Sequence, residues 1–427
     1  MMMFRFKNQI LTLGFILMCL IMKATMIMIP MDNNQNNHLK AYGVAYWSLE
    51  KNVTVDWLLN YRGGSFVISH QSFIEEELII RGVSYEIIAD AQYGLIQSEI
   101  ANPEINQDIV KLEKHPKVAV YSPKNKQPWD DAVTLVLTYA EIPYEIVYDE
   151  EIIRGDLPQF DWLHLHHEDF TGQYGKFWGN AKNTAWYREY VRSNEEMAAK
   201  LGFTKVSDLK LGVALKIKEF VAGGGFMFAM CAATDSYDIA LAAENIDICR
   251  EMFDGDQVDP DIQNMIDYMN GFAFKDYTLV ENPAEYEFSS IDGTSVHKQF
   301  VGQRADHDMF TLFDFSAKWD VIPTMLCQNH ERVIKGFMGQ TTSFRKEHIR
   351  SDVLILGESK YLNTAKYIHG EFGNGTWTFY GGHDPEDHTH YVGDPPTDLN
   401  MYPNSPGYRL ILNNILFPAA KKKKRKT

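Results

Sequence analysis

The chain has 427 residues, of which 45% are hydrophobic and 23% are charged. These values are ordinary for a globular protein, and the length suffices for one large α/β domain or two smaller ones. The formal net charge is −16, and a basic run at residues 421–426 means that the rest of the chain is more acidic still. An acidic protein of this kind repels phosphate backbones, so we do not expect it to bind nucleic acid.

The N-terminal segment, residues 1–31, has the pattern of an export signal. Arg5 and Lys7 precede an unbroken apolar run at residues 10–22, which fits a signal-peptide core and is shorter than the ~20 residues of a membrane helix. Lys23 and a second apolar run leave a retained anchor as the alternative. We therefore expect an exported, periplasmic or envelope-associated protein that touches a membrane only through this segment.

Residues 32–116 are predicted to form an N-terminal α/β extension. Arg62 lies in a glycine turn at a strand end, where its guanidinium can hold a substrate carboxylate. An ordinary turn with a solvated arginine is the alternative. The pattern predicts helices at 38–50 and 73–81 and strands at 53–59 and 84–88.

Residues 117–420 alternate strands with helices, which indicates βαβ units and a doubly wound, mostly parallel sheet. Ligands then collect at the carboxyl ends of the strands. Residues 251–350 break the rhythm and are predicted to be an inserted cap, and residues 421–427 a solvated basic tail. Strands are predicted at 118–121, 144–147, 160–165, 226–230, 353–356, 366–371 and 376–380, and helices at 129–139, 183–200, 206–221 and 408–416.

Cys231 stands where the strand at 226–230 ends and a helical pattern begins at once. A turn residue between a strand and a helix faces the positive end of the helix, which lowers the pKa of a thiol. This is the logic of the nucleophile elbow. A buried cysteine that serves only as a small hydrophobic residue is the alternative. The chain has no CxxC pair, so neither a disulfide framework nor a zinc ribbon is predicted.

A thiol nucleophile needs an imidazole to carry the proton and an acid to orient the imidazole. The strand end after residue 380 offers His383 as the base and Glu386 or Asp387 as the acid. Cleavage of an amide also needs donors for the oxyanion. We expect the amide N–H of Ala232 and a loop that carries the residues His166, His167 and Glu168.

The same histidines fit a second interpretation. Alternate residues of a strand face one way, so His164 and His166 share a face. Together with His167, His383, His388 and His390 they are six histidines near two strand ends that could hold a divalent ion, and Asp384, Glu386 and Asp387 add oxygen ligands. The chain has no HExxH motif, so this metal site is kept as the alternative, and the leading interpretation needs no metal or other cofactor.

From these motifs the chain resembles the class I glutamine amidotransferase-like proteins, which show G-x-C-x-G at the elbow and H-P-E at the base. Here residues 229–233 read AMCAA and residues 383–386 read HDPE. The resemblance covers roughly residues 117–250 and 351–420. It implies a flavodoxin-like α/β fold with Cys231 as nucleophile, His383 as base and Glu386 as its partner.

Nearly the whole chain after the leader is similar to a group of exported bacterial proteins labelled asparagine synthetase B. The stretches FDWLHLHHEDF, FMFAMCAATDSYDIALAAE and FYGGHDPEDHTHYVGDPP carry this likeness. The chain contains neither an SGGxDS pyrophosphate loop nor a GxxxxGK[ST] loop, so ATP-dependent asparagine synthesis is not predicted.

The expected function is that of an exported Cys-dependent amidohydrolase or glutamine amidotransferase-like protein. Its substrate would be the amide of a small molecule or peptide. The alternative is a non-catalytic envelope protein that binds a sugar, a peptide or a metal in the same crevice, and a metal-dependent hydrolase is a third hypothesis.

Overall fold

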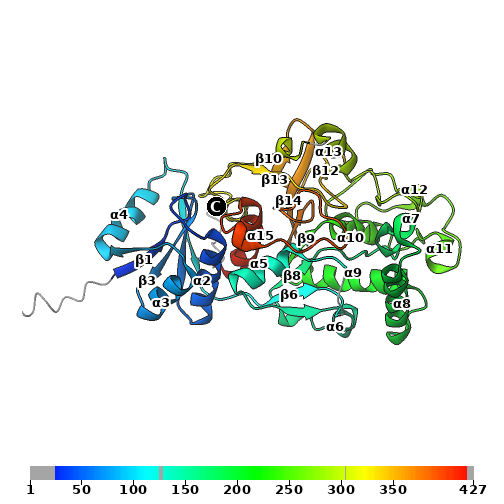
Figure 1. Ribbon diagram of the computed structural model, residues 1–427, viewed down its shortest axis with the longest axis horizontal. Coiled ribbons are helices and arrows are strands. Elements are labelled where there is room, and N and C mark those ends of the chain that lie inside the picture. Colours follow the sequence, from blue (N-terminus) through cyan, green and yellow to red (C-terminus); the bar gives the residue numbers. More distant parts are fainter. Residues whose placement is uncertain (1–24, 125–127, 303, 421–427) are drawn as a thin grey trace, which may run out of the picture.

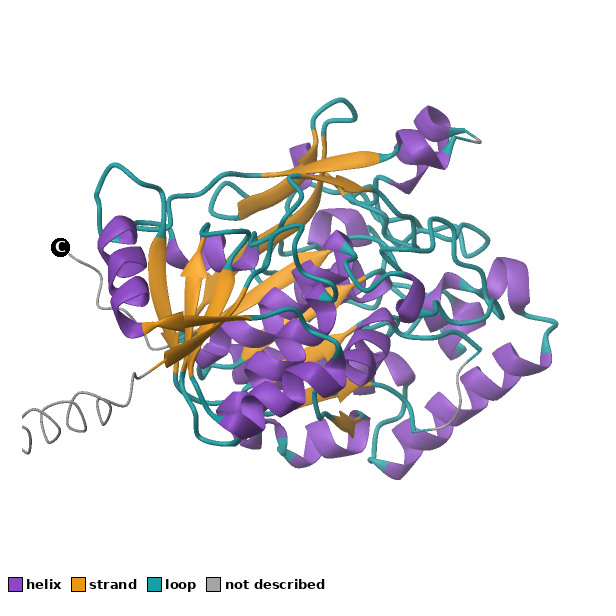
Figure 2. Cartoon of the chain, turned by 60° about the vertical axis from the view of Figure 1, so that its left-hand side comes forward, coloured by secondary structure: helices purple, strands orange, loops and turns teal. Residues whose placement is uncertain are grey.

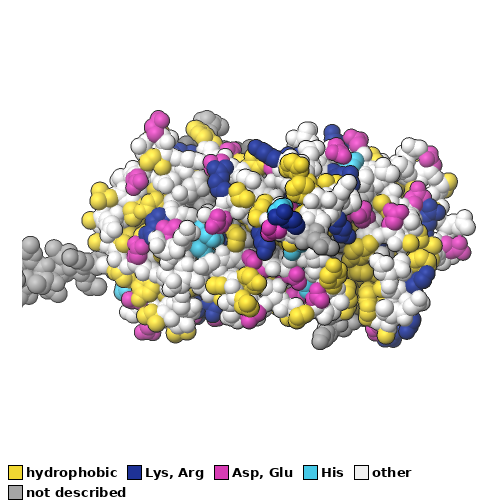
Figure 3. Space-filling model, turned by 45° about the horizontal axis from the view of Figure 1, so that its top comes forward, with side chains coloured by type: hydrophobic (Ala, Val, Ile, Leu, Met, Phe, Trp, Pro, Cys, Tyr) yellow, Lys and Arg dark blue, Asp and Glu magenta, His cyan; other side chains and the backbone are white. Residues whose placement is uncertain are grey.

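The computed structural model describes residues 25–124, 128–302 and 304–420. It shows an α/β protein built on two sheets, the smaller of which lies at one end of the molecule (Figure 1). Lys and Arg side chains are interspersed with Asp and Glu on the face shown in Figure 3. Within the described ranges, every helix is too short or too polar to cross a bilayer.

The small sheet has the order β4-β1-β3-β2-β5, and all its pairings are antiparallel. Ile27 and Trp57 belong to the core that also holds helix α2, whereas Met28 and Leu58 pack with residues of helix α4 on the other face. Alternate strand residues therefore face two different helix layers. The bounds are β1 (Thr25–Ile29), β2 (Val55–Leu59), β3 (Ser65–Ser69), β4 (Glu86–Ala89), β5 (Asp108–Leu112), α2 (His38–Glu50), α3 (Ser72–Arg81) and α4 (Asp90–Ile100).

Strand β1 corrects the end of the predicted leader. Ile27, Ile29 and Met31 have no exposed surface, and β1 lies between β3 and β4. Residues 25–31 are thus part of the folded protein. The sequence assigned them to the leader because a strand buried inside a sheet is as apolar as the core of a signal peptide. The rest of the predicted signal or anchor, residues 1–24, lies outside the described residues, as does the basic tail.

The large sheet has the order β11-β10-β13-β14-β15-β9-β8-β6-β7, with β12 paired to β14. Its strands β7, β6, β8, β9 and β15 are parallel, and the others pair antiparallel. The prediction of a mostly parallel sheet is therefore right only for these five strands. The bounds are β6 (Val118–Tyr121), β7 (Glu145–Val147), β8 (Trp162–Leu165), β9 (Phe226–Met230), β10 (Met309–Leu312), β11 (Val333–Lys335), β12 (Phe344–Arg345), β13 (Leu354–Ser359), β14 (Thr364–Phe372) and β15 (Gly375–Tyr380).

Helices cover both faces of the parallel strands (Figure 2). Val120 faces the core that holds α2, α5 and α15, and its neighbour Tyr121 faces the core that holds α9 and α10. The further helices are α5 (Ala132–Ala140), α6 (Asp149–Arg154), α7 (Trp178–Ala181), α8 (Ala185–Lys200), α9 (Val206–Ala222), α10 (Ala232–Ala242), α11 (Glu251–Asp254), α12 (Ile262–Met265), α13 (Thr294–Val301), α14 (Val321–Leu326) and α15 (Pro406–Leu416).

The predicted cap at residues 251–350 is joined to the main sheet. Its strands β10 and β11 extend the sheet beyond β13, and β12 pairs with β14. These strands have four, three and two residues, too few for an alternating pattern to stand out in the sequence. Strands β10, β11 and β12 were missed for this reason.

Candidate functional site

Three neighbouring strands end at one edge of the large sheet. Leu165 of β8 pairs with Ala229 of β9, and Met230 pairs with Tyr380 of β15. The segments that follow therefore meet, and the amide of Ala233 donates a hydrogen bond to the carbonyl of His166 at 3.0 Å. The predicted strand ends around His166, Cys231 and His383 thus come to a common rim.

His166, His167 and His383 form a compact group at this rim. Their ring centroids are 3.8, 4.6 and 4.8 Å apart, and one nitrogen of each lies within 4.8 Å of the others. His166 and His383 are buried, yet Nε2 of His166 and both ring nitrogens of His383 have no hydrogen-bond or ion-pair partner among the described residues. Buried polar atoms without partners are costly and point to a bound group. A metal ion suits three converging imidazoles.

Carboxylate and carbonyl oxygens orient these rings from behind. Asp131 Oδ2 lies 3.1 Å from His164 Nε2 and 3.2 Å from His166 Nδ1. His167 Nε2 lies 2.7 Å from the carbonyl oxygen of Asp130 and donates to it. This leaves Nε2 of His166 and Nδ1 of His167 for an ion, the arrangement typical of metal-binding histidines. Burial favours protonation of Asp131, but the two imidazoles outweigh it and hold its pKa well below the usual value.

His390 differs from the other rings at the rim. Burial and the neighbouring imidazoles hold the pKa values of His167 and His383 well below the ordinary value, so both rings are neutral. The His390 ring stacks on His383 with centroids 4.3 Å apart. Its Nε2 lies 2.8 Å from Asp130 Oδ1, and its Nδ1 lies 3.0 Å from Asp387 Oδ2. The hydrogen bond with Asp130 is the main reason why its pKa rises to about 9.

Cys231 has the backbone of a strained turn. It precedes α10 with φ 52° and ψ −137°, a conformation that non-glycine residues rarely adopt. Its side chain is 3% exposed, and the amide N–H of Gln340 lies 3.3 Å from Sγ. Burial raises the thiol pKa to about 11, against the lowering effect of the amides of Gln340, Ala232 and Thr341. The predicted lowering of this pKa is therefore wrong, because desolvation outweighs the helix terminus.

The structure brings the three predicted catalytic residues to one edge without joining them. Across the described ranges, no hydrogen bond or ion pair links His383 to Cys231 or to Glu386. The Glu386 carboxyl contacts Ser405 instead, and burial raises its pKa. Their catalytic roles remain a prediction.

Two other predicted site residues are engaged elsewhere. Glu168 is buried, which raises its pKa to about 7, and its Oε2 lies 3.5 Å from the hydroxyl of Tyr148. Arg62 forms ion pairs with Asp32 at 2.8 Å and with Glu86 at 2.9 Å, both in the small-sheet domain. Its guanidinium therefore already has two carboxylate partners, which disfavours the predicted role in substrate binding.

Three of the six histidines that the sequence offered as metal ligands, His166, His167 and His383, form the three-histidine group. His164 lies behind it, with Nε2 3.1 Å from Asp131 Oδ2. His388 Nε2 lies 3.4 Å from Asp308 Oδ2, and His390 pairs with Asp130 and Asp387. His167 and His383 were expected first as a residue of the oxyanion loop and as the catalytic base.

Sequence reasoning missed the residues that support the site. Asp131 caps α5, because its side chain accepts the amide of Thr134 at 2.8 Å. The pair Asp130-Asp131 at the start of the helix predicted at 129–139 was a readable signal for such a cap. Gln340 and Thr341 lie in the aperiodic region, where no pattern marked them.

No protein-family model and no curated protein matches the chain. Solved structures that resemble it include two proteins from Salmonella typhimurium, cytoplasmic protein STM3548 and cytoplasmic protein STM1381. Each has 10% identity and a TM-score of 0.34, with 72% and 71% of this chain and 100% of each of those chains covered. A third, the GH42 beta-galactosidase Gan42B, has 11% identity and a TM-score of 0.26, with 63% of this chain and 28% of that chain covered. Such low scores carry no argument about function, and the resemblance to glutamine amidotransferase-like proteins stays a prediction.

The predicted location is corrected. The expectation of an exported, periplasmic or envelope-associated protein disagrees with the two Salmonella structures, both of which are described as cytoplasmic proteins. The apolar segment that suggested export is also in part the buried strand β1. We therefore do not propose export.

Proposed function

We propose that this chain is a metal-dependent hydrolase whose divalent ion is bound by His166, His167 and His383. The observation that carries the proposal is that Nε2 of His166 and both ring nitrogens of His383 are buried without partners among the described residues, and that these two rings converge with His167. Three histidine ligands leave a position for water, as in catalytic zinc sites, and a bound ion makes that water a nucleophile near neutral pH.

The surrounding residues suit this chemistry. Asp131 fixes the orientation of the His166 ring. A carboxylate in this position also makes the imidazole a more basic metal ligand. A carboxylate oxygen of Asp130 lies within 4.8 Å of ring nitrogens of His383 and His390. Asp130 is therefore close enough to accept the proton of a water molecule that binds at the three histidines.

Metal content tests the proposal directly. Purified protein, reconstituted with Zn²⁺ and dialysed, should hold about one ion per chain by elemental analysis. His383→Ala and His167→Ala should lose the ion, whereas the exposed His307→Ala should keep it. Hydrolysis of ester and amide substrates should occur in the variants that retain the ion and be lost in those that do not. No ion in the wild type refutes the proposal, and an ion without turnover favours the binding protein for a sugar, peptide or metal.

The strand order supports the finer fold assignment that we propose. Along the chain the parallel strands come in the order β6, β7, β8, β9 and β15, with β10 to β14 between the last two. Within the sheet they lie in the order β7-β6-β8-β9-β15. This is the flavodoxin-like order 2-1-3-4-5, in which ligands bind at the carboxyl ends of the strands. It fits a glutamine amidotransferase-like unit.

A thiol-dependent amide hydrolase is the second candidate. The positive φ of Cys231 between β9 and α10 favours it, because a nucleophile elbow needs this strained turn. Amide turnover by Cys231→Ala and by the wild type decides the matter. Equal turnover rejects the thiol mechanism, and loss of turnover in Cys231→Ala with the metal retained supports it.

A further inference from the structure

Backbone amides surround the sulfur of Cys231. The N–H of Gln340 lies 3.3 Å from Sγ, and the amides of Thr341 and Ala232 also lower the pKa of the thiol. Converging backbone N–H groups form a nest that binds an anion. Here the sulfur occupies the nest, so the anion that these amides stabilise is the thiolate itself. Ala232, expected to serve a substrate oxyanion, belongs to this set.

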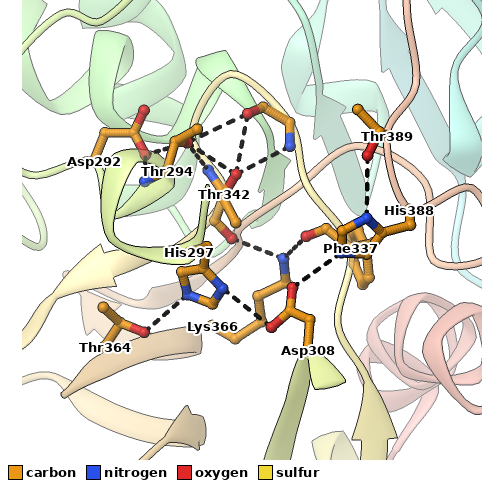
Figure 4. Close-up of polar contacts among 11 residues, drawn as sticks. Asp292, Thr294, His297, Asp308, Phe337, Thr342, Thr364, Lys366, His388 and Thr389 are labelled. Carbon is orange, nitrogen blue, oxygen red and sulfur yellow. Dashed lines mark hydrogen bonds and ion pairs between the residues drawn. The ribbon is translucent and has the colours of Figure 1, made fainter. Parts of the chain in front are cut away.

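Lys366 holds the loop that supplies two of these amides. It lies on β14 and is 2% exposed. Its Nζ donates to the carbonyl of Phe337 and, at 2.8 Å, to the carbonyl of Thr342 (Figure 4). These carbonyls stand at the two ends of residues 337–342, so the Lys366 amino group, charged or neutral, holds both ends of the loop.

Hydroxyl groups hold the same loop from another side. Thr342 donates its amide to Thr294 Oγ1 at 3.1 Å, and that hydroxyl donates to Asp292 Oδ1 at 2.6 Å (Figure 4). Thr341 Oγ1 donates to the buried Asp235 at 2.8 Å. The loop is therefore restrained on both sides of Gln340, and its amides point at the sulfur as a fixed set.

We propose that Lys366 is a positioning residue that keeps the amides of Gln340 and Thr341 directed at Cys231, so that this thiol reacts preferentially with small electrophiles. The inference deepens the second candidate function. It does not depend on the metal centre, because the reactivity of a thiol can be measured without metal and without turnover. The other free cysteines are the references for this ranking. Burial raises the pKa of Cys327 and of Cys249 without a comparable set of amides, and Cys327 is the most exposed of the three.

The test is the rate of alkylation of each cysteine by iodoacetamide from pH 6 to pH 10, read by peptide mass spectrometry. In the wild type, Cys231 should react faster than Cys327 at each pH below its own pKa. In Lys366→Met, alkylation of Cys231 should slow by about tenfold and its pH profile should move upward, because hydrogen bonds to the thiolate are lost. The control Lys346→Met, a partly exposed ion-pair partner of Glu358, should leave the profile unchanged.

The opposite result is equally clear. A lysine that only maintains the fold would, when removed, loosen the loop and speed alkylation of Cys231. Faster alkylation or an unchanged profile therefore overturns the proposal. Should Lys366→Met fail to fold, Thr294→Val is the second variant, because it removes the hydroxyl that restrains the loop. It should also slow the alkylation of Cys231, measured relative to that of Cys327. Equal rates for Cys231 and Cys327 in the wild type also overturn it.

Discussion

Asp131 offers the sharpest test of the three-histidine site. Its carboxylate contacts His164 at 3.1 Å and His166 at 3.2 Å while it caps α5. Asp131→Asn keeps a side chain that caps a helix equally well, so the fold should be retained. The substitution removes the negative charge that orients and polarises His166. Loss of such an outer partner weakens metal binding by about 10- to 100-fold, or about 1.4 to 2.7 kcal/mol.

The assay is a competition titration of Zn²⁺ between the protein and a chromophoric chelator, with thermal unfolding of the metal-free protein recorded in parallel. Asp398→Asn is the matched control, because Asp398 is an exposed cap that accepts the amide of Asn400 at 3.0 Å. It should leave the affinity unchanged. Equal affinities for wild type and Asp131→Asn would refute the reasoning, and so would equal losses in both variants.

Four further predictions concern stability. Lys210→Met leaves the buried carboxylate of Asp149 without its ion-pair partner, which lies at 3.0 Å, and should lower the free energy of unfolding in urea by about 3–5 kcal/mol. Burial lowers the pKa of Lys366 from 10.5 to about 7, so the unfolded chain binds more protons between these values. The free energy of unfolding should therefore rise with pH over that range. Urea titrations at pH 7 and pH 9 should show this rise in the wild type, and the Lys366 contribution to it should be absent in Lys366→Met. Gly43→Ala places a Cβ 1.8 Å from the carbonyl oxygen of Ala140 and should cost about 1–3 kcal/mol. At Gly94, where nothing lies within 4 Å, the same change should stabilise α4 by about 0.5–1 kcal/mol.

Much of the fold could be predicted from local patterns. The apolar run at 226–230 and the helical pattern after Cys231 match β9 and α10. Parallel strands also bring their carboxyl ends to one edge, which is why the rim was foreseen. The second apolar run, residues 24–31, misled the prediction of where the leader ends, because a buried strand and a signal-peptide core have the same composition.

The partners within the site could not be predicted. Position along a strand does not tell which way His383 turns after the two glycines. In the structure its ring stacks on His390 and lies 4.6 Å from the ring of His167, and it makes no hydrogen bond with the thiol. Two of the amides around Cys231 come from Gln340 and Thr341, in a region without periodicity. Only the packing of remote segments determines these contacts.

The pairing of β9 with β15 has a consequence for when the proposed metal ion could bind during synthesis. His166 and His167 leave the ribosome long before His383, which follows β15 near the end of the chain. Until β15 is made, β9 remains an open edge and the group of imidazoles lacks its third member. Loading of the ion must therefore wait for the last strand, and a chain cut before residue 375 would lose the ion and leave an edge prone to aggregation.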